Sequence, residues 1–490
     1  MPDRYDQVRY PGHAFAQTHP DRVAALATLF GIEPVAPARC RLLEIGCGDG
    51  GNLLGMALAL PQASFVGFDL SGRAIDLARA RVAELGLTNL RLEEIGIEDF
   101  EAEAGSVDYV VAHGVYSWVP DPVREQLLAL CGHVLSARGV AFVSYNALPG
   151  YRQRQTLREL LAVELEGVDE PGERLAGARR VLARLSGENE PATVIGAEAA
   201  ALDARSDALL FHDALAEVND AFAISDFAAR AGGHGLQYLA EADLRDLRVD
   251  MLPADVRDAL PGPDDILRRE TVLDYLRLRR FRQTLLCRAE LAVDRVPAAA
   301  RIASLAAASP ARALVADAER PGLVTFEAPG GARMSSDDER VVAALVRIGQ
   351  AWPAAVRVAD LIEEATAERA LCEALLDGAL RGVVWLHADP PALSPSPGER
   401  PCASALARLQ ARDGEPVVTL RHASIRVDDE LDRRVLALLD GTRDRAALRA
   451  ELAGFDGLDS DALAERIEVI LDRTARAGLL FDGRRSAARR

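Results

Sequence analysis

Residues 42–52 read Leu-Leu-Glu-Ile-Gly-Cys-Gly-Asp-Gly-Gly-Asn, an apolar strand that runs into a glycine-rich turn and then into a helix. Gly46, Gly48 and Gly50 allow positive φ angles and leave a bare backbone against which a ligand can lie. The stretch also fits the dinucleotide fingerprint G-x-G-x-x-G, with Gly51 as its last glycine. The pattern therefore predicts a nucleotide-cofactor loop, and glycine alone does not choose the cofactor.

Acidic side chains in the loop favour a cationic cofactor. Glu44 and Asp49 would place two negative charges close to a pyrophosphate, whereas the sulfonium and ammonium of S-adenosylmethionine would be attracted to them. Asp69 ends the next predicted strand, where an acid accepts hydrogen bonds from both ribose hydroxyls. Because NAD would use Asp69 in the same way, this residue indicates a nucleoside only. We expect S-adenosylmethionine; the alternative is an ordinary strand-turn-helix with a glycine-rich bend.

Short apolar strands alternate with amphipathic helices from residue 41 onward. This order predicts an α/β fold with a doubly wound parallel sheet, whose ligand crevice lies at the carboxyl ends of the strands. The expected strands are residues 41–45, 64–68, 90–94, 107–112 and 140–145, and the expected helices are residues 50–60, 73–85 and 122–135.

The residues that follow these strands are candidates for the site. Ile97 and Glu98 follow the third strand and are placed to meet an adenine, although Glu98 is equally placed to cap the next helix. Two tyrosines, a phenylalanine and two histidines fall within residues 5–19, which suggests a lid over the cofactor or, equally, a leader packed onto the domain. The candidate cofactor-binding residues are Glu44, Gly46, Cys47, Gly48, Gly50, Asn52, Asp69, Leu70, Ile97, Glu98, Tyr5 and Tyr10.

Aromatic and polar residues follow the fourth and fifth strands, where the transferred methyl group should lie. Tyr116 and Trp118 could wall a cationic donor and an amine acceptor, because aromatic faces stabilise cations. Trp118 could instead be a core residue under the loop. The candidate catalytic residues are His113, Tyr116, Trp118, Tyr145 and Asn146.

Composition limits the classes of partner. The 490 residues, 49% of them apolar, are enough for two to four domains. A formal net charge of −18 argues against a broad nucleic-acid or anionic-membrane surface, and the chain contains no lysine among its 57 basic residues. The six scattered cysteines show no metal-ligand spacing, so we expect no metal. No signal peptide or apolar run of membrane-spanning length is found, and we expect a cytoplasmic protein without membrane insertion.

Several longer strings resemble one family of enzymes. They are YDQVRYPGHAFAQTHPDR, LLEIGCGDGGNLL, HGVYSWVP, VSYNALPGY, GLQYLAEADL and FRQTLLCR, which together span residues 5–288. They are similar to the bacterial class I S-adenosylmethionine-dependent methyltransferases that carry a methyltransferase regulatory domain, a group that includes the rickettsial protein lysine methyltransferases. Tyr151 departs from the family, which more usually has tryptophan at this position.

The resemblance implies a Rossmann-like seven-stranded sheet. Residues 236–240 and 282–287 would be its last two strands, and residues of about 152–232 would form a helical insertion. The resemblance also implies that the cofactor is held by Glu44, Gly46, Gly48 and Asp69, and that the reaction centre is lined by Tyr116, Trp118, Tyr145 and Asn146.

The C-terminal part contains a repeated pattern. Residues 296–310 are rich in proline and alanine and predict a linker. Beyond them, three helices and a strand occur twice, about 95 residues apart, which suggests two winged-helix-like units. No basic recognition helix is evident, so docking or dimerisation is expected, with a second copy of the chain as a candidate partner. The expected domains are a lid segment (1–35), a methyltransferase core (36–292) and two winged-helix-like domains (311–393 and 402–483).

Three functions remain open at this point. The first is a protein methyltransferase that acts on lysine side chains, and the second is a methyltransferase of a small metabolite or lipid intermediate. The third is a cofactor-sensing regulator with little turnover. An open acidic channel would favour a polypeptide acceptor, and an enclosed apolar pocket would favour a metabolite.

Overall fold

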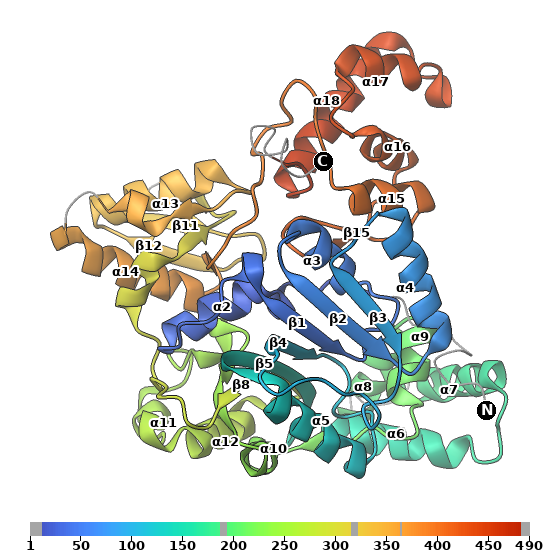
Figure 1. Cartoon of the computed structure of the whole chain (residues 1–490), viewed down its shortest axis with the longest axis vertical. Helices are drawn as coiled ribbons and strands as arrows, with labels where there is room; N and C mark the ends of the chain where they lie inside the picture. The colour runs from blue at the N-terminus through green and yellow to red at the C-terminus, as the bar shows by residue number, and fades with distance from the viewer. Residues whose placement is uncertain (1–11, 187–193, 315–321, 363–364, 482–490) are drawn as a thin grey trace.

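A computed structural model describes residues 12–186, 194–314, 322–362 and 365–481. Figure 1 shows that the fold is α/β, with a central β-sheet covered by helices. The strand order is β3-β2-β1-β4-β5-β8-β7, and the short β6 pairs with β5 outside this path. Neighbouring strands from β3 to β5 are parallel, whereas β8 is antiparallel to both β5 and β7. The strands are β1 (Arg41–Ile45), β2 (Ser64–Asp69), β3 (Leu90–Glu94), β4 (Val107–Ala112), β5 (Leu135–Ala147), β6 (Ala221–Phe222), β7 (Leu236–Glu241) and β8 (Phe281–Arg288). The predicted Rossmann-like class I methyltransferase sheet is confirmed.

Helices cover both faces of this sheet, which explains why nearly every residue of its central strands β1 and β4 is buried. In β1, Leu42 packs into the cluster on one face while Leu43 and Ile45 pack into the cluster on the other. The first face is covered by α2 (Pro20–Leu29), α3 (Leu53–Ala59) and α4 (Gly72–Glu84), and the second by α5 (Asp121–Val134), α10 (Ile224–Gly233) and α12 (Ile266–Arg277).

A group of helices inserted after β5 projects from the sheet and has its own small core. Leu157, Leu161, Leu182 and Phe211 are among its buried side chains. The group consists of α6 (Arg152–Glu164), α7 (Pro171–Leu185), α8 (Val194–Asp203), α9 (Asp207–Leu209) and a π-helical turn (Leu210–Ala214). A further short helix, α11 (Ala254–Asp258), precedes α12. The insertion follows the carboxyl end of β5 and lies at the lower right of Figure 1.

The prediction that residues 296–310 are a linker is wrong. Ala306, Ala307 and Ala308 are buried and form β9, the middle strand of the three-stranded sheet β13-β9-β14. Ala307 packs into the same hydrophobic cluster as α2 and α3, so the following unit shares a core with the methyltransferase sheet. Alanine content was misleading here because small side chains serve close packing as well as flexible linkers.

This first C-terminal unit combines two small sheets with two long helices. The assignment of a winged-helix-like fold to it stays a prediction. Its elements are β9 (Ala306–Ala308), β10 (Arg312–Ala313), β11 (Val324–Glu327), β12 (Arg333–Ser336), α13 (Glu339–Ala351), β13 (Val356–Arg357), α14 (Ala365–Leu380) and β14 (Trp385–His387).

The second C-terminal unit packs beside α3 and α4, two of the helices that cover the same face of the sheet as α2 (Figure 1). The sequence predicted its last three helices, but not the first helix or the small hairpin. Its elements are α15 (Ala405–Asp413), β15 (Val417–Val418), β16 (Ser424–Ile425), α16 (Glu430–Leu438), α17 (Arg445–Glu451) and α18 (Ser460–Arg476). Within the described residues, no helix has the length and apolar character that crossing a bilayer requires.

Candidate active site

The glycine loop between β1 and α3 borders open space at one position. Gly46, Gly48 and Gly50 have φ angles of 70°, 53° and 73°, a region that glycine enters without strain. A Cβ added to Gly46 would lie 2.7 Å from a methyl group of Val115, whereas a Cβ on Gly48 would meet no atom within 4 Å. Gly48 therefore faces the side of the loop that is free to receive a ligand.

Asp69 is held beside this loop by backbone amides. Its two carboxylate oxygens accept hydrogen bonds from the N–H groups of Gly48 and Ser71, each at 2.9 Å. Leu70 follows it with 66% of its surface exposed, and its side chain lies next to Gly96 together with that of Glu98. The ends of β2 and β3 thus bring together an acid and an exposed apolar side chain, as recognition of a nucleoside requires.

Glu44 is the buried acid of the site. Its Oε1 accepts a hydrogen bond of 2.8 Å from the side-chain amide of Asn52, while its Oε2 has no hydrogen-bond partner among the described residues. Burial, with a smaller contribution from the charge of Asp69, raises the pKa of Glu44 to about 8. A cation placed against Oε2 would supply the missing partner and favour the ionised carboxylate.

Two other candidate cofactor residues occupy different positions. The Cys47 side chain is 7% exposed and points toward Gly67 on β2, beneath the loop, and burial raises its thiol pKa well above the ordinary range. Ile97 is half-buried and packs against the cluster on the α5 face. Cys47 therefore supports the loop from below and does not line the open side of it.

The N-terminal segment lies directly on the glycine loop. The Gly12 amide donates to Asp49 at 3.2 Å, and the Phe15 amide donates to Asn52 at 3.1 Å. The Phe15 ring packs edge-to-face against His113, with 4.1 Å between ring centroids. Residues from Gly12 onward therefore contact the predicted site, while Tyr5 and Tyr10 lie outside the described residues.

His113 is held at the end of β4 by the hydroxyl of Ser144. Its Nδ1 lies 2.8 Å from Ser144 Oγ, which also accepts the Gly114 amide at 2.8 Å. Burial lowers the pKa of His113 to about 4, so the imidazole is neutral at pH 7. A group with so low a pKa is a weak proton acceptor, which argues against His113 as a general base.

Tyr116 and Tyr145 were expected to line the reaction centre, but neither side chain lies on an open surface. Both rings are 0% exposed and pack with Phe227 in the cluster on the α5 face. Side chains alternate along β5, so Tyr145 points away from the face that carries Ser144 and Asn146. Trp118 is half-buried, and its backbone amide closes the turn by donating to Val115 at 2.8 Å.

Asn146 does lie at a junction of several sequence motifs. Its backbone amide donates to the Ser117 hydroxyl at 2.8 Å, and its side-chain amide donates to Asn219 at 2.6 Å. The hydroxyl of Tyr151 donates to the same Asn219 oxygen at 3.0 Å. Ser117 and Asn219 were not predicted, because a buried serine and an asparagine in an irregular segment give no periodic signal.

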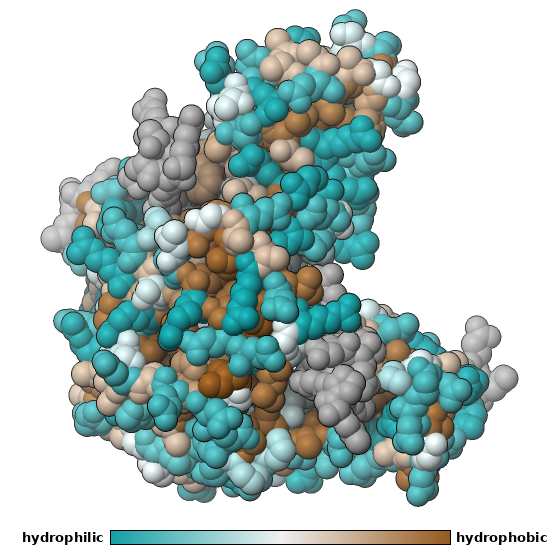
Figure 2. All heavy atoms as spheres, turned by 45° about the vertical axis from the view of Figure 1, so that its right-hand side comes forward, coloured by the Kyte–Doolittle hydropathy of each residue, from teal (hydrophilic) through white to brown (hydrophobic). Residues whose placement is uncertain are grey.

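An open groove of about 690 Å³ adjoins this junction between the inserted helices and the loop before β6, and Asn219 is part of its wall. Its acidic side chains are Glu159, Asp169, Glu217 and Asp220, and its basic ones are Arg158 and Arg174. Both arginines donate to backbone carbonyls, of Ala216 and Val168 respectively. All the residues that line the groove lie between Gln155 and Asp220. Figure 2 shows in addition that the outline of the molecule is concave between the second C-terminal unit and the inserted helices, with hydrophilic side chains over most of both rims.

The residues at the glycine loop fit S-adenosylmethionine. The unpartnered Glu44 oxygen suits a cationic group, Gly48 leaves room for close approach, and Asp69 with Leu70 suits the adenosine part. When bound, this cofactor supplies a methyl group carried on a sulfonium. Glu44, Gly48 and Asp69 are the residues that would hold it.

Three family models match separate parts of the chain. A model described as a methyltransferase domain matches residues 42–139, and a predicted methyltransferase regulatory domain matches residues 206–288. The C-terminal winged helix domain of PKMT matches residues 399–455. The regulatory region contains β7 and β8, so in this fold it completes the edge of the central sheet.

Individual relatives agree with these matches. Protein RP789 of Rickettsia prowazekii is 37% identical over 296 residues, which are 59% of this chain and 54% of RP789, so the match spans about half of that relative. RP028 of the same organism is 32% identical over 46% of this chain and 93% of its own length. Two structures of PKMT2 from Rickettsia typhi, one in complex with AdoHcy, share the fold over 96% of this chain and 99–100% of theirs, with TM-scores of 0.83 and 0.84 and 22–23% identity.

Proposed function

Because the chain belongs to the class I S-adenosylmethionine-dependent methyltransferases that carry a methyltransferase regulatory domain, we propose that it methylates lysine side chains of a protein substrate. The methyl donor is S-adenosylmethionine. The match of the C-terminal unit to the winged helix domain of PKMT supports a protein acceptor, and so does the fold that the chain shares with PKMT2.

The groove beside Asn146 is the observation that carries this proposal. It is open to solvent, and Glu159, Asp169 and Glu217 are exposed along it, so a cationic segment of an acceptor would be attracted. Its inner wall is connected to the end of β5 through the bond between Asn219 and Asn146. A small apolar metabolite would favour an enclosed pocket lined by hydrophobic side chains instead.

The main requirement of the reaction is that the protein aligns the acceptor amine with the methyl group of the cofactor. Methyl transfer to an amine is an in-line displacement at the methyl carbon, and the amine must first lose a proton from an ammonium with a pKa near roughly 10.4. The low pKa of His113 argues against this histidine as the group that accepts the proton. Burial raises the pKa of Tyr116 to about 12, so this tyrosine is protonated at neutral pH and cannot accept the proton either. We therefore assign deprotonation to solvent in the groove, assisted by desolvation of the amine as it enters.

Because the chain contains no lysine, labelled methyllysine in an assay cannot come from self-methylation and must come from the substrate. The full-length protein is incubated with tritiated S-adenosylmethionine and a panel of basic, lysine-bearing proteins, and the products are hydrolysed to identify methyllysines. We expect label in methyllysine, and none with the Asp69→Ala variant. Label confined to low-mass products would contradict the proposal and identify a metabolite methyltransferase.

A further inference from the structure

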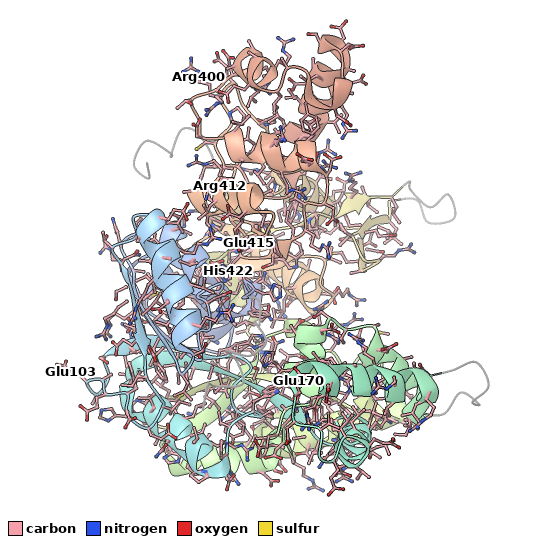
Figure 3. The ribbon with its side chains drawn as sticks, turned by 90° about the vertical axis from the view of Figure 1, so that its right-hand side faces the viewer. Glu103, Glu170, Arg400, Arg412, Glu415 and His422 are labelled. Atoms are coloured by element: carbon pink, nitrogen blue, oxygen red, sulfur yellow. The ribbon has the colours of Figure 1, made fainter. Side chains whose placement is uncertain are left out.

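The hairpin of the second C-terminal unit, formed by β15 and β16, contacts the cofactor loop. Between β15 and β16, His422 adopts a positive φ of 58° and places its ring beside α3, where it is 4% exposed. Figure 3 shows His422 where the second C-terminal unit meets the methyltransferase domain, with Glu415 and Arg412 farther out along the same interface. Its Nε2 lies 2.8 Å from the side-chain oxygen of Asn52, a residue 370 positions earlier in the chain.

The direction of this hydrogen bond follows from the neighbours of Asn52. The Phe15 backbone N–H can only donate, so the Asn52 atom it contacts at 3.1 Å must be the oxygen. His422 Nε2 contacts that same oxygen and therefore carries the proton. The Asn52 nitrogen is thereby turned toward Glu44, to which it donates at 2.8 Å. The Thr18 hydroxyl lies within hydrogen-bond distance of both ends of the Asn52 amide and fits either orientation, so His422 and Phe15 determine which end faces the acid.

The ring of His422 is fixed in a neutral form. Among the described residues, the ionisable group that faces it is His19 on the N-terminal segment, with 5.1 Å between ring centroids. Burial first, and then the charge of His19, lowers the pKa of His422 well below the ordinary range. A neutral imidazole has a single N–H, and the contact with Asn52 uses it.

The hairpin is itself anchored on the first C-terminal unit. The guanidinium of Arg421 lies 4.4 Å from the ring centroid of Trp352 and 4.5 Å from that of Trp385, and it donates to the Pro353 carbonyl at 2.8 Å. Gly55 on α3 gives the hairpin room, because a Cβ there would lie 3.1 Å from Val418. Both C-terminal units therefore hold the ring of His422 in place.

We propose that His422 is a positioning residue for the cofactor: by orienting Asn52, it holds Glu44 with one carboxylate oxygen available to the ammonium of the cofactor's amino-acid part. The cofactor site is then complete only when the second C-terminal unit packs against α3. The inference depends on the cofactor and is independent of which acceptor is methylated.

The test compares two ligands by titration calorimetry with the full-length protein. S-adenosylhomocysteine carries the amino-acid part, whereas 5′-methylthioadenosine lacks it. In His422→Phe, a ring remains but the donor is lost, and we expect S-adenosylhomocysteine to bind about tenfold more weakly while the affinity for 5′-methylthioadenosine stays within about twofold, as for loss of one hydrogen bond in a buried network. His422→Gln, which keeps a donor, should recover much of the loss.

Arg412→Ala is the matched control, because Arg412 pairs with Glu84 across the same interface at 2.7 Å without contacting Asn52. It should bind both ligands as the unaltered protein does. Unchanged binding of S-adenosylhomocysteine by His422→Phe would overturn the inference. So would an equal loss for both ligands, because that outcome indicates damage to the loop as a whole. Retained binding of 5′-methylthioadenosine also shows that the variant is folded.

Discussion

The imidazole Nδ1 of His387 lies 2.5 Å from Oδ2 of Asp21, and both side chains are buried. The pair joins α2 to β14 of the first C-terminal unit. The second Asp21 oxygen accepts the Asp389 amide at 2.6 Å, so the carboxylate is bonded on both oxygens. This relationship shows that the first C-terminal unit is built into the methyltransferase core.

Replacing Asp21 by asparagine should destabilise the protein by about 2 kcal/mol, because the buried carboxylate accepts hydrogen bonds from both His387 and the Asp389 amide. Burial acts to raise the pKa of Asp21, but His387 and the Asp389 amide outweigh it and lower the pKa to about 2. Stability from the ionised carboxylate is therefore present above about pH 4 and lost as pH falls toward 2. Thermal unfolding from pH 5 to 2 measures this, and Asp21→Asn should show a smaller decline over that range. Identical declines in the two proteins would contradict the prediction.

Cofactor binding should release a proton near neutral pH. Glu44, with its pKa raised to about 8 by burial, is protonated at pH 7 before binding, and a cation beside it favours ionisation. Affinity for S-adenosylhomocysteine should therefore rise by up to about tenfold per pH unit between pH 6 and 8, and level off above 8. Calorimetry in buffers of different ionisation enthalpy counts the released proton. Glu44→Gln should bind more weakly and lose the pH dependence; if the slope persists in this variant, another group is responsible.

Asp69 should act on the nucleoside part of the cofactor. Asp69→Asn keeps the shape of the side chain but removes the charge, so we expect about tenfold weaker binding of both S-adenosylhomocysteine and 5′-methylthioadenosine. Titration of both ligands distinguishes this pattern from the selective loss expected for His422→Phe. A loss restricted to S-adenosylhomocysteine would place Asp69 against the amino-acid part instead.

Reversing charge in the groove should affect the acceptor and not the cofactor. Glu217→Arg should raise the KM for a basic, lysine-bearing protein several-fold and reduce the salt dependence of KM, because Glu217 is exposed along the groove. Affinity for S-adenosylhomocysteine should not change. Glu103→Arg makes the same charge change on the far side of the molecule, away from the insertion marked by Glu170 in Figure 3. Equal effects of the two substitutions would exclude the groove as the acceptor site.

Local sequence patterns were sufficient to predict the cofactor-binding part of the molecule. Strand, glycine loop and acid follow one another within residues 41–69, and the structure places Glu44, Gly48 and Asp69 around one loop. These features are local, because a glycine turn and the alternation of strand and helix depend on neighbours a few residues away. The two last strands were also found, through longer strings that resemble a family.

The residues that surround that loop could be identified only from the three-dimensional packing of the chain. Tyr116 and Tyr145 fall in the expected strand ends, yet packing buries both rings, and Asn219 takes a place beside Asn146 that no local pattern indicates. His422 reaches Asn52 across 370 positions because two separate units pack on the sheet. Side-chain direction and long-range contact result from packing of the whole chain, and a pattern read along a single segment carries no information about either.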